Sequence, residues 1–283
     1  MNRKYNLIKL VTFLVINLMT VNLTVNSADF EKGLNAAQSG DFETAFYEWL
    51  PLAENGNSEA QYNLGLIFYD RAFDDTYGEP EDDKNALYWF KLAANQGHVR
   101  AQTNLGLMYD KGYGVDQSYF KAEKWYLLAA GQGSRNAQFN LGQMYRRGEG
   151  VEQDYVKAIY WYKLAAEQGD ADAQSNLGVM YLNISDITIH SYKEAVKWFK
   201  LASEQGHSKA QYNLASMYLL GKGVKKNLDY AYMWASISHI NGNKNGFKIK
   251  TMVSKQLNVS HIENIKRLVL DCVNNDYKEC SYF

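Results

Sequence analysis

The fold is decided by residues 137–169, which read AQFNLGQMYRRGEGVEQDYVKAIYWYKLAAEQG. Five residues in the second half of this stretch fall at i, i+3, i+4, i+7 and i+8, the spacing of one helix face. They are Ala158, Trp161, Tyr162, Ala165 and Ala166. Gly169 follows as a helix terminator, because glycine reaches the left-handed backbone conformation at little cost. The stretch therefore predicts two helices joined by a turn and closed by a glycine.

Four further copies of this pattern lie along the chain. A first block begins with Ala-Gln and carries Leu-Gly, and a second block carries a tryptophan and closes with glycine. The tryptophans are Trp89, Trp125, Trp161, Trp198 and Trp234, at successive spacings of 36, 36, 37 and 36 residues. A repeat of this length is typical of a solenoid, in which each unit buries its apolar face against the next.

Glycine recurs in the middle of the first predicted helix, where it costs about 0.5–1 kcal/mol relative to alanine. The residues are Gly65, Gly106, Gly142 and Gly178, and Ala215 takes the place in the last repeat. We expect the missing side chain to let a neighbouring helix approach closely. The Trp and Tyr residues are then expected to fill the space between the layers.

Polar residues also recur at fixed places. The residue after each inter-repeat glycine enters the next helix as Asn57, His98, Ser134, Asp170 or His207, and three of these five are favoured N-cap types. His98 and His207 are expected to be capping or surface residues. An asparagine row belongs to the same pattern and is interpreted first as structural hydrogen bonding. It consists of Asn63, Asn104, Asn140, Asn176 and Asn213.

This pattern resembles the Sel-1-like repeat family, a relative of the tetratricopeptide repeat. The residues that carry the resemblance include 137–145, Gly148-Glu149-Gly150-Val151 and Ala165-Ala166-Glu167-Gln168-Gly169. The resemblance implies an all-α, right-handed α–α superhelical solenoid that acts in protein–protein interaction in an exported bacterial protein. It places an incomplete unit at 29–56 within a solenoid at 29–242, five repeats at 57–242, and capping helices at 243–283. A capping box of Ser260 and Glu263 is expected in this last segment.

Two turns depart from the family pattern, at 74–80 and 183–190. Either is a binding protrusion or simple drift in length, since a solenoid tolerates insertions between helices. A cysteine-rich subset of the family has been credited with β-lactam-binding or hydrolysing activity. The repeat cysteines of that subset are absent here, which argues against the same activity.

Residues 1–27 read as a signal peptide. Three basic residues precede the apolar run LVTFLVINLMTV at 10–21, and small residues follow up to Ser27 and Ala28. The alternative is an uncleaved anchor, but the run is shorter than the ~20 residues that a spanning helix needs. Export to the periplasm or the medium favours pairing of Cys272 with Cys280 over two free thiols.

No set of residues in the sequence predicts a catalytic, cofactor or metal site. The net charge of the whole chain is −1, and without a Lys/Arg footprint nucleic acid is not expected as a partner. The resemblance instead implies a groove lined by the first helices, with candidate protein-binding residues on either side of the repeat glycine. They are Tyr62, Arg100, Phe139, Arg146, Arg147 and Tyr212.

The leading hypothesis is an exported adaptor that binds a protein and is not an enzyme. It would work in envelope assembly or in contact with a host. One alternative is a hydrolase that acts on cell-wall or β-lactam material. Another is a purely structural envelope component, and the sequence names no partner for any of the three.

Overall fold

The computed structural model describes residues 28–72, 80–183, 189–277 and 280. These residues form fourteen helices and no strand, as expected. None of these helices combines the length and the apolar character needed to cross a bilayer. The predicted signal peptide at 1–27 and most of the two divergent turns, at 74–79 and 184–188, lie outside the described residues. The chain divides into two compact units, residues 1–96 and 97–283.

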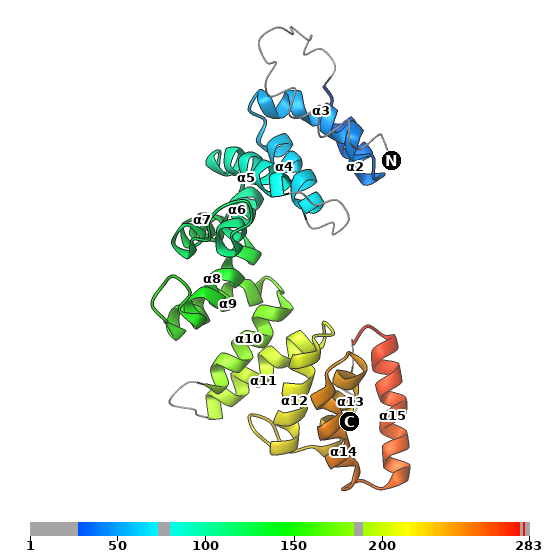
Figure 1. Cartoon of the computed structure of the whole chain (residues 1–283). Coiled ribbons are helices and arrows are strands. Elements are labelled where there is room, and N and C mark those ends of the chain that lie inside the picture. The colour runs from blue at the N-terminus through cyan, green and yellow to red at the C-terminus, as the bar shows by residue number, and fades with distance from the viewer. Residues whose placement is uncertain (1–27, 73–79, 184–188, 278–279, 281–283) are drawn as a thin grey trace, which may run out of the picture. The chain divides into compact units, whose positions relative to one another are not determined.

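The N-terminal unit consists of two helical hairpins. Helix α2 (Phe30–Gln38) packs on α3 (Phe42–Glu54), and α4 (Ser58–Ala72) packs on both α3 and α5 (Pro80–Asn95). Figure 1 shows these four helices in blue and cyan.

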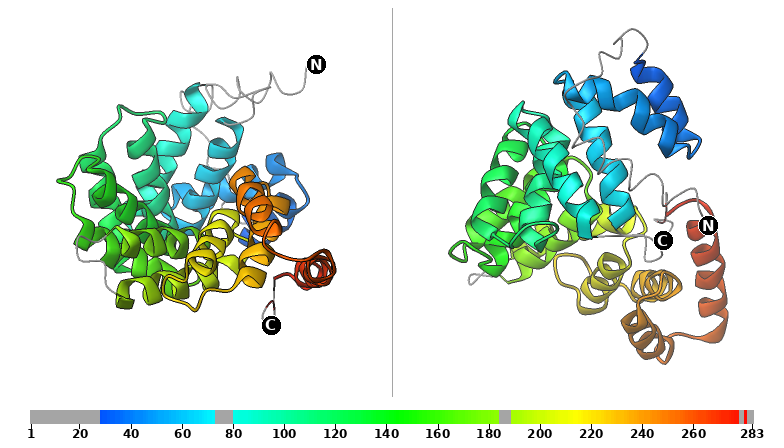
Figure 2. Two further views of the ribbon diagram at one scale, coloured as in Figure 1. Left: turned by 90° about the horizontal axis from the view of Figure 1, so that it is seen from below. Right: turned by 45° about the horizontal axis from the view of Figure 1, so that its top comes forward.

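The C-terminal unit stacks four hairpins and a terminal pair (Figures 1 and 2). The first helices of the hairpins are α6 (Val99–Lys111), α8 (Arg135–Arg147), α10 (Ala171–Leu182) and α12 (Ser208–Leu220). The second helices are α7 (Tyr119–Gly131), α9 (Tyr155–Glu167), α11 (Ile189–Ser203) and α13 (Leu228–Ile240). Helices α14 (Lys244–Ser254) and α15 (Val259–Asn274) pack on α13 at the end of the unit.

All five residues at the inter-repeat N-cap position cap the next helix. Asp170 Oδ1 accepts from the Ala173 amide at 2.7 Å, and His207 Nδ1 accepts from the Ala210 amide at 3.1 Å. Asn57, His98 and Ser134 make the equivalent bond. The imidazole therefore replaces the usual Asx or Ser cap, since its unprotonated nitrogen is also an acceptor. The glycines that close the second helices have φ between 81° and 92°, as expected.

The repeat glycines do face a close neighbour, but that neighbour is not the tryptophan. A Cβ added to Gly142 would lie 2.6 Å from Cδ1 of Tyr162, the residue after the repeat tryptophan. The same relation joins Gly65 to Phe90, Gly106 to Tyr126 and Gly178 to Phe199. These four rings are fully buried, whereas Trp89, Trp125 and Trp161 are partly exposed. The expectation that Trp and Tyr fill the space between the layers holds for Tyr126, Tyr162, Trp198 and Trp234, whereas the tryptophans of the first three repeats are only partly buried. The reason is that the ring one residue further on faces the glycine.

Trp49 in the first hairpin follows the same rule. It lies seven residues before Gly56, as Tyr162 does before Gly169, so it occupies the ring position and not the tryptophan position. A Cβ on Gly33 would lie 2.5 Å from Nε1 of Trp49, and this indole donates to the Phe30 carbonyl at 3.2 Å. The one-residue shift of this tryptophan is thus explained by its contact with Gly33.

A row of buried glutamines ties the stacked hairpins together. Gln138 Nε2 donates to the Ala130 carbonyl of the preceding hairpin, and its Oε1 accepts from Gln168 Nε2 at 2.7 Å. Gln174 and Gln211 repeat both bonds in the following hairpins. Because each amide is 4 % exposed or less, its donors and acceptors must be satisfied inside the protein. The sequence pattern contained these glutamines, but their role came only from the structure.

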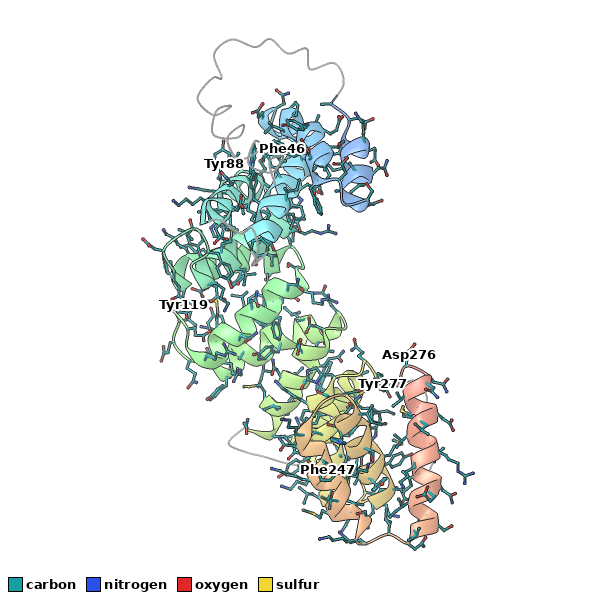
Figure 3. All side chains as sticks on the ribbon, turned by 45° about the vertical axis from the view of Figure 1, so that its right-hand side comes forward. Phe46, Tyr88, Tyr119, Phe247, Asp276 and Tyr277 are labelled. Atoms are coloured by element: carbon teal, nitrogen blue, oxygen red, sulfur yellow. A yellow bond between two sulfur atoms is a disulfide. The ribbon has the colours of Figure 1, made fainter. Side chains whose placement is uncertain are left out.

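The C-terminal cap differs in detail from the expectation. Asn258, and not Ser260, is the N-cap of α15 and accepts from the His261 amide at 2.8 Å, while Glu263 pairs with Lys266. Cys272 and Cys280 are joined by a disulfide. Tyr277, in the turn at 275–277 that follows α15 (Figure 3), donates to the side chain of Asn241 at 2.9 Å. This turn is thereby held against the last hairpin.

Candidate protein-binding surface

The solvent-facing side of each first helix in the C-terminal unit is a strip of four residues. In α8 the strip consists of Asn136, Asn140, Gln143 and Arg147, at i, i+4, i+7 and i+11. The residues at its two ends are exposed and the central two are partly buried. Residues at this spacing lie above one another on one face of a helix.

The same strip recurs on the other first helices of this unit. On α6 it is Arg100, Asn104, Leu107 and Lys111, on α10 it is Asp172, Asn176, Val179 and Asn183, and on α12 it is Lys209, Asn213, Ser216 and Leu220. The second residue of every strip is therefore asparagine. Its equivalent in the N-terminal unit is Asn63 on α4.

The asparagine row does not make the structural hydrogen bonds that the sequence led us to expect. Within the described part of the chain, none of the five side chains forms a hydrogen bond. All five are partly buried, yet none of their amide atoms is among the buried atoms left without a partner. The donors and acceptors of these amides therefore reach the surface, where they are available to another molecule.

An asparagine amide has a carbonyl acceptor beside an NH₂ donor, which matches the N–H and C=O of a peptide group. The row asparagines of the C-terminal unit come from successive hairpins, in which each first helix packs on the second helices before and after it. An extended segment that runs along the stack would therefore meet one amide in each hairpin.

Two of the six predicted partner-binding residues lie on the strips. Arg100 is an exposed end residue of the α6 strip, one helical turn before Asn104. Arg147 is the exposed end residue of the α8 strip and forms an ion pair with Glu149 at 3.3 Å. Lys111 and Lys209 occupy equivalent ends, so four of the strip ends in α6, α8 and α12 are cationic.

The other four predicted residues pack inside their hairpins. The Tyr62 ring lies 5.8 Å from Phe90 and the Phe139 ring 5.9 Å from Tyr162, centroid to centroid. Tyr62 is 9 % exposed. Arg146 Nε donates to the Tyr162 hydroxyl at 3.3 Å. Tyr212 is partly buried against the core of the last hairpins.

Burial is the main cause of the shifted pKa values of two tyrosines near these helices. Burial raises the pKa of Tyr162, and the neighbouring Arg146 opposes that rise. Burial, together with the hydrogen bond to Glu123 at 2.7 Å, raises the pKa of Tyr145 to about 12. Among the described residues, no group of three or more His, Cys, Asp or Glu side chains has a metal-binding arrangement.

The known proteins that are similar to the chain include a bacterial and a plant protein. A Sel1 repeat protein from Oxalobacter formigenes, whose crystal structure is known, is 30 % identical with a TM-score of 0.68, over 80 % of this chain and 87 % of that one. The ERAD-associated E3 ubiquitin-protein ligase component HRD3B of Arabidopsis thaliana is 34 % identical over 94 residues. That match spans 33 % of this chain and 13 % of the plant protein.

The Sel1 repeat family model matches five successive segments: residues 58–98, 99–134, 135–170, 171–207 and 208–238. These segments cover well over half of the chain and hold the glycine, glutamine and asparagine positions described above. The expected fold, an all-α solenoid of Sel1-like repeats, is confirmed. The chain belongs to the Sel1 repeat family.

Proposed function

We propose that the protein is an exported, non-enzymatic scaffold that binds an extended segment of a partner protein along the row asparagines of the C-terminal unit, which are Asn104, Asn140, Asn176 and Asn213. Sel1 repeat proteins generally mediate protein–protein interaction and are typically not enzymes. The observation that carries the proposal is the set of equivalent, surface-reaching asparagine amides that have no hydrogen bond within the described residues.

The strips also define the kind of segment that fits. Amides that bind the peptide backbone do not discriminate between sequences, so selectivity comes from the strip ends. Arg100, Lys111, Arg147 and Lys209 are cationic there, and Asp172 is acidic and paired with His207 at 3.0 Å. The preferred segment is therefore extended and carries acidic side chains.

Selection from a displayed library of random 12-residue peptides provides the test. Selected peptides should be rich in Asp and Glu and low in helix propensity. The Asn140→Ala/Asn176→Ala variant should bind them at least tenfold more weakly, because each lost hydrogen bond is worth about 0.5–1.5 kcal/mol. Asn95→Ala is the matched control, since Asn95 is an exposed asparagine on the second helix α5 and belongs to none of the strips, and it should bind normally.

Backbone N-methylation of a selected peptide separates this mode from side-chain recognition. Methylation removes the donors that the asparagines would accept, so affinity should fall although every side chain is kept. Unchanged binding by the methylated peptide would disprove backbone recognition.

Export is a separate part of the proposal and rests on the character of residues 1–27. Amino-terminal sequencing of the protein from its own cells should find a mature chain that starts at Ala28 or Asp29. A chain that keeps Met1 in the cytoplasm would contradict it.

A further inference from the structure

Charge is distributed unevenly between the two units. Residues 28–96 contain 14 acidic and 4 basic residues, whereas residues 97–283 contain 17 acidic and 23 basic residues. The whole-chain value of −1 conceals this difference. Opposite charges on different parts of one chain attract when two molecules meet.

Positive charge lines the outer face of α14. Lys244, Lys248, Met252 and Lys255 lie at i, i+4, i+8 and i+11 and are all exposed. None of the three lysines forms an ion pair within the described residues. Met252 and the neighbouring Phe247 are each 53 % exposed, while the opposite face of α14 is buried. We call this exposed cationic and apolar face the α14 face.

Helix α3 in the N-terminal unit carries the complementary pattern at the same spacing. Glu43, Tyr47, Pro51 and Glu54 also lie at i, i+4, i+8 and i+11. Both glutamates are exposed and have no ion pair within the described ranges, and Tyr47 is 41 % exposed. We call this acidic and apolar face the α3 face.

We propose that the α14 face of one molecule docks on the α3 face of a second copy. On each face the two outermost charges are eleven residues apart, roughly 16 Å along a helix. Glu43 and Glu54 therefore match Lys244 and Lys255 whichever way the helices run. The apolar side chains between the charges, Tyr47 and Met252, then exclude water from the centre of the contact.

The two faces differ, so this contact is heterologous and joins molecules head to tail. One helix pair buries less surface than a permanent interface does, so association is weak and depends on salt. A second copy accounts for both faces. A lipid surface or an unrelated acidic protein would account only for the α14 face.

The proposal can be tested by reversing the charges on each face and measuring self-association by sedimentation velocity, at about 10–500 μM protein in low salt. The wild-type chain should self-associate, with at least tenfold weaker association in 0.5 M salt. Lys244→Glu/Lys248→Glu/Lys255→Glu and Glu43→Lys/Glu54→Lys should each be monomeric. A one-to-one mixture of the two should associate again, because each variant supplies the face that fits the other. Glu152→Lys/Lys193→Glu, at exposed sites that belong to neither face, is the control and should behave as wild type.

Three results would overturn the inference: a wild-type chain that stays monomeric throughout, association that the reversals leave unchanged, or two variants that do not associate when mixed. Circular dichroism of each variant establishes that it is folded. Variants of the asparagine row should self-associate normally, so this inference and the proposed function fail or stand separately. The wild-type chain could also bind anionic phosphatidylglycerol vesicles without self-associating, while the α14 variant does not bind them. That result would overturn the inference and identify a membrane, and not a second copy, as the partner of the α14 face.

Discussion

The third and fifth repeats solve the same packing problem with different residues. In the third repeat, Gly142 on α8 leaves room for the fully buried Tyr162 on α9. In the fifth repeat the same two positions hold Ala215 on α12 and Ala235 on α13, and both are fully buried. A glycine with a large ring and a pair of alanines are thus alternative fillings of one helix contact.

The surroundings explain why the fifth repeat can omit the ring. Every residue from 231 to 238 on α13 is buried, because α14 and α15 cover this helix from outside. A Cβ on Gly246 of α14 would lie only 2.6 Å from the Ala235 carbonyl oxygen, so the backbones approach closely there. Inner repeats depend on large side chains between two helices, whereas the last repeat also gains burial from its cap.

Tyr162→Ala should have the largest effect, because it imposes the alanine of the fifth repeat on a site with no cap to compensate. Truncating a buried aromatic side chain costs about 3–5 kcal/mol. Urea denaturation followed by circular dichroism measures the loss. Tyr160→Ala is the control, since Tyr160 lies on the same helix and is 56 % exposed. An equally small loss for both variants would show that the Tyr162 ring does not support the contact.

Gly142→Ala should also destabilise, although alanine is the better helix former. The new methyl group would lie 2.6 Å from the Tyr162 ring, and overpacking costs about 1–3 kcal/mol. Gly131→Ala, near the end of α7, meets nothing within 4 Å and should instead be neutral or gain up to about 1 kcal/mol. If the two substitutions shift the melting temperature in the same direction, the close approach at Gly142 is refuted.

The pH dependence of the stability of the protein should reveal the contribution of Tyr145, which lies in the third repeat. Its pKa is raised from 10.0 to about 12, so the folded state favours the neutral phenol. This contribution is complete below pH 10 and is lost as the pH rises from about 10 to about 12. Tyr145→Phe should remove it, which makes the difference between the two urea midpoints shrink across that window. A constant difference would show that Tyr145 ionises equally easily in both states.

Ala215→Gly should have the smallest effect. It restores the glycine of the inner repeats, but the position that holds the facing ring in those repeats is Ala235 here, so it gains no packing. The helix-propensity cost of about 0.5–1 kcal/mol should appear almost alone. A stabilised variant would mean that Ala215 is crowded, which would end the interpretation that two alanines suit this contact.

Periodicity within the chain was sufficient to predict the hairpins, their inter-repeat glycines and the all-α class. These features depend on neighbours three or four residues apart and on a backbone conformation that glycine favours. The prediction did not extend to a choice between two adjacent residues. Trp161 and Tyr162 are adjacent on an apolar face, and the pattern could not tell which of them meets Gly142. That choice depends on how α9 is rotated against α8.

The sequence by itself determined a Sel1 repeat solenoid with two helices in each repeat. Only the tertiary structure decided which polar residues hold it together and which remain available. Gln138 and Asn140 belong to the same block, yet the first is satisfied between two hairpins and the second has no hydrogen bond among the described residues. The physical reason is that a side chain two residues further along a helix is turned by about 200°, away from the neighbouring hairpin and toward solvent.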